Sequence, residues 1–186
     1  MEHLTREQVI AVLREARARS ERDWTLLLVT FWHGLRASEA ISLTPAHFAD
    51  GYLSIQRLKG SKHTTQPLVE DPDPLLNEKL AVESWLAKAP KNGDGSRPLR
   101  LFAISRIQLY KLFRRYCAIA GIPRHLSHPH VLKHSIAMQS IKAAGIENVR
   151  AYLGHVSIAS TGEYLKVDDA EASAAVVVAA KARKPT

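Results

Sequence analysis

The chain has 186 residues, which is enough for one sizeable hydrophobic core or at most two small domains. Its single cysteine, Cys117, excludes an intrachain disulfide and a thiolate metal cluster, and its longest apolar run, 172–180, is too short to cross a bilayer. The net charge of +8 is uneven: residues 97–150 hold ten Lys or Arg and one acid, whereas residues 1–50 hold six basic and seven acidic residues. This asymmetry indicates a polyanionic partner such as nucleic acid, with a merely solvated basic face as the alternative.

The first fifty residues predict three helices. Thr5 is suited to cap the first of them. The second is apolar nearly all round, which predicts a buried helix that ends at Gly34. The third is stopped by Thr44-Pro45. The expected helices cover about 5–20, 23–33 and 38–43.

The next segment carries the one clear β signal. Residues 51–58 alternate between apolar and polar, residues 59–62 have turn composition, and residues 64–69 return. A helix to about Ala89 follows Pro74.

The second half is expected to be helical after a mobile surface loop over 90–98. Ser105 is suited to cap a helix to about Ala120, with Lys111, Arg114 and Arg115 opposite its apolar side and Cys117 in the core. Further helices are expected at about 130–144, 147–153, from Ser157 through Tyr164, and at 168–180, before a basic tail. We therefore expect one mainly α domain over 1–186 with a small antiparallel β-sheet.

Three polar segments lie at the expected helix ends. Arg36 follows the helix-ending Gly34, and its planar guanidinium suits a phosphate, although a lone arginine there is more often a surface cap. His130 and Lys133 share a helix face. His134, four residues after His130, raises the alternative of a zinc site, but no third ligand stands nearby, so we expect no metal.

The last polar segment joins His155, after Leu153-Gly154, to Tyr164 nine residues later. Taken alone, His155 would satisfy carbonyls at a helix end and Tyr164 would be a packing residue.

Together, the order and spacing of these segments resemble the tyrosine recombinase (phage integrase) family over about residues 4–170. In that family an arginine in Gly-Leu-Arg-x-Ser-Glu precedes a hairpin lysine, a His-x-x-Arg-His segment, a Leu-Gly-His segment and a tyrosine. The matching positions are 34–39 with Arg36, Lys59 with Lys62 close by, 130–134, 153–155 and Tyr164.

The resemblance implies a tyrosine recombinase catalytic-domain fold and site-specific DNA strand cleavage and rejoining. Tyr164 would attack a DNA phosphate to form a 3′-phosphotyrosyl link, with neither metal nor cofactor. Arg36 would hold the non-bridging oxygens, and Lys59 would protonate the leaving 5′ oxygen. His130 would act as base or phosphate ligand, and His155 would donate a hydrogen bond to the phosphate.

The chain departs from the family pattern at Lys133, which stands where an arginine is usual. Lysine keeps the charge but loses the two-pronged fork, and one lost preorganised donor costs on the order of 10²–10³-fold in rate. We expect reduced activity, with a catalytically inactive DNA-binding member as the alternative. Arg124 is a conceivable substitute donor.

The expected partner is double-stranded DNA, contacted by Lys62, Lys111, Arg114 and Arg115. Members of the family usually carry an additional N-terminal domain. Its absence indicates a short member or a piece of a longer protein, with weaker and salt-sensitive DNA binding. Residues 168–186 would form an exchange helix and basic tail. We expect a cytoplasmic protein without membrane attachment, monomeric alone and tetrameric in a synapse on DNA.

Two other classes compete with a recombinase or integrase of a mobile element. A topoisomerase of related chemistry would relax supercoiled DNA without a specific site. A basic RNA-binding module is disfavoured because only 6% of residues are aromatic, and none form an obvious stacking pair. The biological role (integration, transposition, inversion or resolution) and the target sequence stay open.

Overall fold

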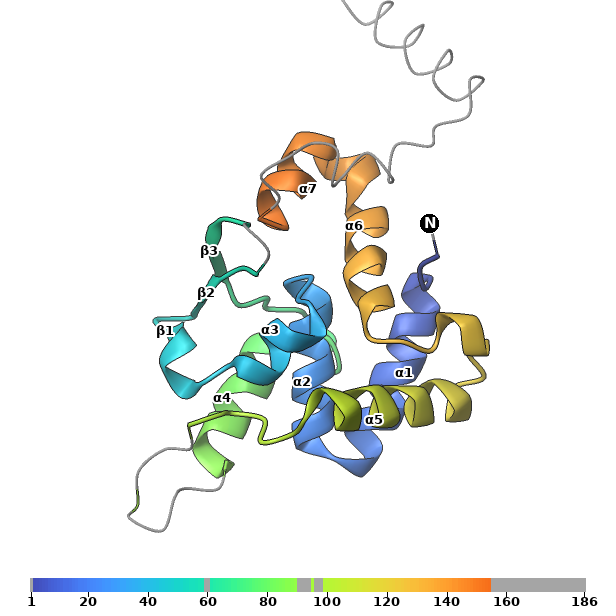
Figure 1. Cartoon of the computed structure of the whole chain (residues 1–186), viewed down its shortest axis with the longest axis horizontal. Helices are drawn as coiled ribbons and strands as arrows, with labels where there is room; N and C mark the ends of the chain where they lie inside the picture. Colours follow the sequence, from blue (N-terminus) through green and yellow to red (C-terminus); the bar gives the residue numbers. More distant parts are fainter. Residues whose placement is uncertain (1, 59–60, 90–94, 96–98, 155–186) are drawn as a thin grey trace, which may run out of the picture.

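The computed structural model describes residues 2–58, 61–89, 95 and 99–154 (Figure 1). Its elements, in chain order, are α1 (Arg6–Arg19), α2 (Glu21–Trp32), α3 (Ala37–Ser42), η1 (Pro45–His47), β1 (Phe48–Ala49), β2 (Tyr52–Gln56), β3 (His63–Pro67), α4 (Glu78–Lys88), α5 (Arg106–Ile119), η2 (Arg124–Leu126), α6 (His130–Ala144) and α7 (Ile146–Tyr152). The expectation of a mainly α fold with a small antiparallel sheet is confirmed.

Helix α2 lies at the centre of the helical part and contacts α1, α3, α4 and α6 (Figure 1). Its side chains are buried without interruption from Asp23 to Phe31, which confirms the interpretation of an all-round apolar sequence. A fully buried aliphatic side chain contributes about 1.5–3 kcal/mol. Trp24 and Trp32 on α2 donate their indole N–H groups to the backbone oxygens of Leu75 and Leu76, which fixes α2 against the segment before α4.

The expected caps are present at two helix starts. Thr5 accepts from the backbone N–H of Gln8, whose side chain in turn accepts from the Thr5 N–H. Ser105 and Gln108 form the same reciprocal pair at the start of α5. Such a cap contributes about 1 kcal/mol because it satisfies N–H groups that have no partner inside the helix. On α5, Cys117 is fully buried, as expected.

The sheet has the antiparallel order β1-β2-β3, and Ser54 pairs with Thr65 at the middle of the expected hairpin. Strand β1 was not expected, because two residues are too few to show an alternating pattern. It pairs with β2 through the Asp50-Gly51 turn, in which φ is positive at both residues. This is the backbone of a tight hairpin turn that Asp-Gly favours.

Several expectations lie outside the described residues: the hairpin tip at 59–60, the 90–98 loop apart from residue 95, and everything from 155 onward, including the helix with Tyr164 and the 168–186 segment. Within the described part, no helix combines the length and the apolar character needed to span a bilayer.

Candidate functional site

The site begins at the sharp turn between α2 and α3. Gly34 has φ +55, a left-handed backbone that favours glycine, and this turn places Arg36 at the start of α3. The space around Gly34 is also tight, because a Cβ atom there would lie 2.5 Å from Leu153 Cδ2 and 3.7 Å from Lys133 Cγ. The turn therefore brings the Gly-Leu-Arg segment against α6 and the end of α7.

Arg36 is oriented by Glu39, one helical turn later. Its Nη1 atom donates to Glu39 Oε1 at 2.9 Å and to the Leu58 backbone oxygen at 3.1 Å, and its backbone N–H donates to Glu39 Oε2 at 2.7 Å. The side chain keeps 20% of its surface exposed. Within the described residues Nε and Nη2 have no acceptor, so one edge of the guanidinium is available to an incoming oxyanion.

The Glu39 carboxylate joins the start of α3 to the end of β2. It is 1% exposed, and besides Arg36 it accepts from the Leu58 backbone N–H at 2.9 Å. Burial alone raises the pKa of Glu39, but the Arg36 and Leu58 hydrogen bonds and the charge of Arg57 outweigh it and hold the pKa below its usual value. Glu39 therefore supports Arg36 through direct contacts.

Arg57 lies fully buried beneath the hairpin, and all of its polar nitrogens have partners. Nη2 donates to the His33 backbone oxygen at 2.7 Å, Nε to Thr64 Oγ1 at 2.9 Å, and Nη1 lies 3.5 Å from Glu39 Oε2. Gln66 Oε1 accepts from the same guanidinium and lies 2.7 Å from His33 Nδ1. Arg57 is therefore a positioning residue that links α2, α3 and the hairpin, and each of its three nitrogens is engaged within the fold.

The buried network continues away from the site. His33 Nε2 lies 2.8 Å from Glu78 Oε1, and neither side chain has exposed surface. Gln66 Nε2 donates to the Tyr152 backbone oxygen at 2.7 Å, which ties the sheet to α7. The hairpin and α7, which each adjoin a segment of the family pattern, are thus held together by a shared set of polar side chains.

Lys133 lies on the first turn of α6, and its side chain is close enough to Arg36 for the two charges to interact. The residue is 2% exposed, and its Nζ atom has no hydrogen-bond partner in the part of the chain that the structure describes. Burial, followed by the charges of Arg36 and Arg57, lowers its pKa to about 7, with Glu39 acting in the opposite direction. The ammonium group of Lys133 is therefore available to a bound ligand, and it forms no structural ion pair within the described residues.

His130 begins α6, one turn before Lys133, and its ring meets that of His134 edge-on with centroids 4.4 Å apart. Burial, then the neighbouring His130 and Lys133, lowers the pKa of His134 to about 4, so His134 is neutral at physiological pH. Among the described residues no group of three His, Cys, Asp or Glu could hold a metal ion.

Gly154, the middle residue of the Leu-Gly-His segment, contacts the hairpin. Gly154 has φ +70, and its backbone oxygen accepts from the Lys62 N–H at 3.0 Å. A Cβ atom at Gly154 would lie 3.0 Å from Arg57 Cγ and 3.3 Å from the Lys62 oxygen. This docking brings the residue before His155 to the same hairpin that carries Lys62, whose side chain is exposed.

The basic stripe on α5 is a second feature. Lys111, Arg114 and Arg115 are all exposed, as expected for a binding face. Together with Arg124 they line a surface groove between α5 and η2, and an adjoining groove extends from Arg114 to His128, near the start of α6. Arg124 therefore belongs to this basic surface.

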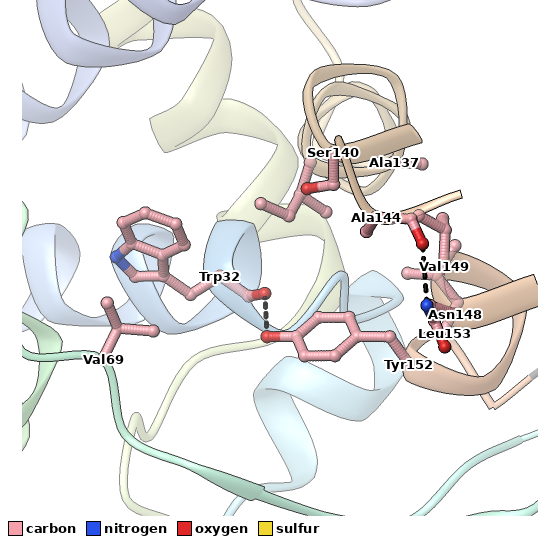
Figure 2. A pocket seen from close by; sticks show the side chains of 10 residues that line it. Trp32, Val69, Ala137, Ser140, Ala144, Asn148, Val149, Tyr152 and Leu153 are labelled. Carbon is pink, nitrogen blue, oxygen red and sulfur yellow. Dashed lines mark hydrogen bonds between the residues drawn. The ribbon is translucent and has the colours of Figure 1, made fainter. Parts of the chain in front are cut away.

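An apolar pocket lies between α2, α6 and α7 (Figure 2). Two of its polar side chains are bonded to backbone oxygens: Tyr152 Oη donates to the Trp32 oxygen at 2.8 Å and Asn148 Nδ2 to the Ala144 oxygen at 2.7 Å. This lining offers no charged group for a phosphate, whereas Arg36 and Lys133 are both basic.

The structure thus brings together Arg36 and Lys133, puts His130 on the same helix as Lys133, and docks Lys62 beside Gly154. Lys59, His155 and Tyr164 lie outside the described residues. Arg57 and Gln66 were missed as site residues. The available signal was strand periodicity, because 53, 55 and 57 share the buried face and a charged residue there must be paired.

Comparisons with known proteins agree with this architecture. The model of the phage integrase family matches residues 2–171. The chain is 32% identical over 185 residues to the tyrosine recombinase XerC of Ralstonia pickettii, covering 89% of this chain and 56% of that protein. It is 30% identical over 176 residues to the type 1 fimbriae regulatory protein FimE of Escherichia coli K12, covering 87% and 84%. The chain thus spans little more than half of the XerC relative.

Solved structures with the same fold include XerA recombinase, with a TM-score of 0.74, 19% identity and coverage of 100% of this chain and 65% of that one. The lambda integrase catalytic core gives a TM-score of 0.65 at 16% identity, with coverage of 83% and 92%. Because the family model matches nearly the whole chain, the protein belongs to the phage integrase family.

Proposed function

We propose that this domain cleaves and rejoins double-stranded DNA at a specific site through a 3′-phosphotyrosyl intermediate at Tyr164. The observation that carries the proposal is the Arg36–Lys133 cluster. Three basic side chains, Arg36, Arg57 and Lys133, meet one buried carboxylate, Glu39. Buried cations are costly without partners, so this arrangement favours an oxyanion between Arg36 and Lys133.

The geometry supports a division of labour. Glu39 and the Leu58 carbonyl hold one nitrogen of Arg36, which presents its other edge to the non-bridging phosphate oxygens as negative charge builds. Lys133 adds a donor from α6. His130, Lys59 and His155 are assigned the supporting roles of base or phosphate ligand, leaving-group acid and phosphate donor. Because the phosphotyrosyl bond conserves the energy of the broken phosphodiester bond, the reaction consumes no nucleotide.

DNA recognition is proposed to use Lys62, Lys111, Arg114 and Arg115. The groove along α5 carries several exposed cations and extends to His128, beside the start of α6, which would place backbone phosphates in line with the reacting one. Related structures are described as bound to DNA substrate, and one as a lambda integrase tetramer bound to a Holliday junction. We accordingly propose a tetramer on DNA, a monomer without it, and a cytoplasmic location.

The test is the formation of a covalent protein–DNA adduct. The full chain is incubated with a pool of nicked duplexes that have a randomised core, because a nick traps the phosphotyrosyl intermediate by releasing a short strand. Adducts are recovered after denaturation in detergent. Wild-type protein is expected to retain DNA and to enrich particular sequences, whereas Tyr164→Phe retains none.

Two results would contradict this proposal. Wild-type protein that binds duplex DNA but forms no adduct would identify a non-catalytic DNA-binding member, and Lys133→Arg would then show whether the lysine is the cause. Adducts without sequence enrichment, together with relaxation of supercoiled plasmid, would identify a topoisomerase.

A further inference from the structure

We propose that Lys133 binds the reacting phosphate only with the uptake of a proton, so that oxyanion binding at this site weakens as the pH rises through neutrality. The inference rests on the proposed function for the identity of the oxyanion. It concerns the lysine itself, which departs from the arginine usual at this position.

The geometry that carries the inference is a buried ammonium group without a partner. Lys133 is 2% exposed, its Nζ atom makes no hydrogen bond in the described part of the chain, and its stem packs beside Gly34. An unpartnered buried cation is costly, and the cost disappears when the amine is neutral or when an anion arrives.

The charged groups that face Lys133 favour the neutral amine in the empty site. Arg36 at the start of α3 and Arg57 beneath the hairpin oppose a third positive charge, and only the Glu39 carboxylate favours it. Glu39 is already engaged by Arg36, Arg57 and the Leu58 N–H group. With burial these charges lower the pKa of Lys133 to about 7.

Two imidazoles on α6, those of His130 and His134, lie within one turn of Lys133. His134, whose pKa is lowered to about 4, keeps the same neutral form across the range in question. His130 packs against His134 and lies one turn from Lys133, so variants at position 133 are needed to assign a pH dependence to the lysine.

An arriving oxyanion reverses the balance. Its negative charge, placed between Arg36 and Lys133, makes the ammonium form favourable, and the proton comes from solvent. Linkage then requires that the anion bind more weakly above the pKa of the empty site. With that pKa about 7, binding is expected to weaken about 30-fold between pH 6 and pH 8.5. An arginine at this position would stay charged throughout and show no such loss.

The direct test uses the full chain and sulfate, a tetrahedral oxyanion that does not itself titrate in this range. The ¹³Cε resonance of Lys133, assigned by its loss in Lys133→Met, reports the protonation of Nζ in wild-type protein. Its midpoint is expected near 7 without sulfate and to rise when sulfate is added. A midpoint above 10 in the free protein, or one that sulfate does not move, would overturn the inference.

Variants separate Lys133 from the histidines. Sulfate affinity of Lys133→Arg is expected to change less than about 3-fold over the same pH range, because the arginine stays protonated throughout. The matched control is Lys79→Arg, at a partly exposed lysine paired with Glu70, which should behave as wild type. Equal pH dependence in wild type and Lys133→Arg would assign the effect to another group and overturn the inference.

These results are distinguishable from those of the adduct assay. A sulfate-dependent midpoint without any DNA adduct would keep this inference and refute the proposed activity. Tyr164-dependent adducts with an ordinary Lys133 titration would refute the inference and keep the activity.

Discussion

Arg57 and Lys133 are both almost fully buried basic side chains within one cluster, yet their surroundings differ. Every nitrogen of the Arg57 guanidinium has an acceptor, whereas Lys133 Nζ has none among the described residues. Burial lowers the pKa of both groups, but for Arg57 the charge of Glu39 offsets much of the effect. The contrast separates a cation that organises the fold from one held ready for a ligand.

The largest expected effect is the loss of stability on replacing Arg57, the cation that organises the fold. Arg57→Met removes the side-chain donor of the His33 oxygen and one hydrogen-bond partner each of Gln66 and Glu39, and breaking such a buried pair costs about 3–5 kcal/mol. Urea unfolding should show this loss. Arg36→Met is the comparison variant, because Arg36 is partly exposed. This variant should lose oxyanion binding, but its urea midpoint should stay closer to that of wild type. Equal loss of stability in both variants would remove the distinction between the two arginines.

Lys133→Met, in contrast, should stabilise the folded protein. The pKa of Lys133 is lower in the folded chain than in the unfolded chain, so between pH 7 and pH 10 the unfolded state binds more protons. Wild-type stability attributable to Lys133 therefore rises with pH in that window. The stabilisation gained by Lys133→Met should be greater at pH 7 than at pH 9 by about 2 kcal/mol.

Urea unfolding of both proteins at the two pH values measures this difference directly. A Lys133→Met variant that is less stable than wild type at pH 7 would show that the ammonium group has a stabilising partner. In that case the contrast with Arg57 would not hold.

Local signals were enough to predict most of the helices. Thr5 and Ser105 cap α1 and α5 as expected, and α6 has the expected bounds of His130–Ala144. Each of these elements is fixed by residues within a turn or two of its ends. The Asp50-Gly51 turn carried an equally local signal that was overlooked, since Asp-Gly between alternating segments is typical of a tight hairpin.

The candidate site was predictable only in part, because its chemistry depends on contacts between distant segments. Arg36 and Lys133 were recognised from motif spacing, but nothing near position 133 indicates that Arg57 lies close enough to lower its pKa. Likewise Gln66 is an ordinary strand residue until the fold places it between His33 and the Tyr152 oxygen. Periodicity predicts which face is buried, but not which polar partners meet there.

The smallest expected effect tests whether the position of Arg57 depends on the close packing of Gly154, which follows α7. Gly154 and Gly121 have nearly the same backbone, with φ +70 and +71, so substitution by Ala strains both by about 1–2 kcal/mol. Only at Gly154 does a Cβ atom meet neighbours, 3.0 Å from Arg57 Cγ and 3.3 Å from the Lys62 oxygen, whereas Gly121 has nothing within 4 Å. Gly154→Ala should therefore lose about 1 kcal/mol more than Gly121→Ala in urea unfolding. Equal losses would mean that the hairpin yields freely, and that Arg57 is held by its hydrogen bonds alone and not also by the packing of Gly154.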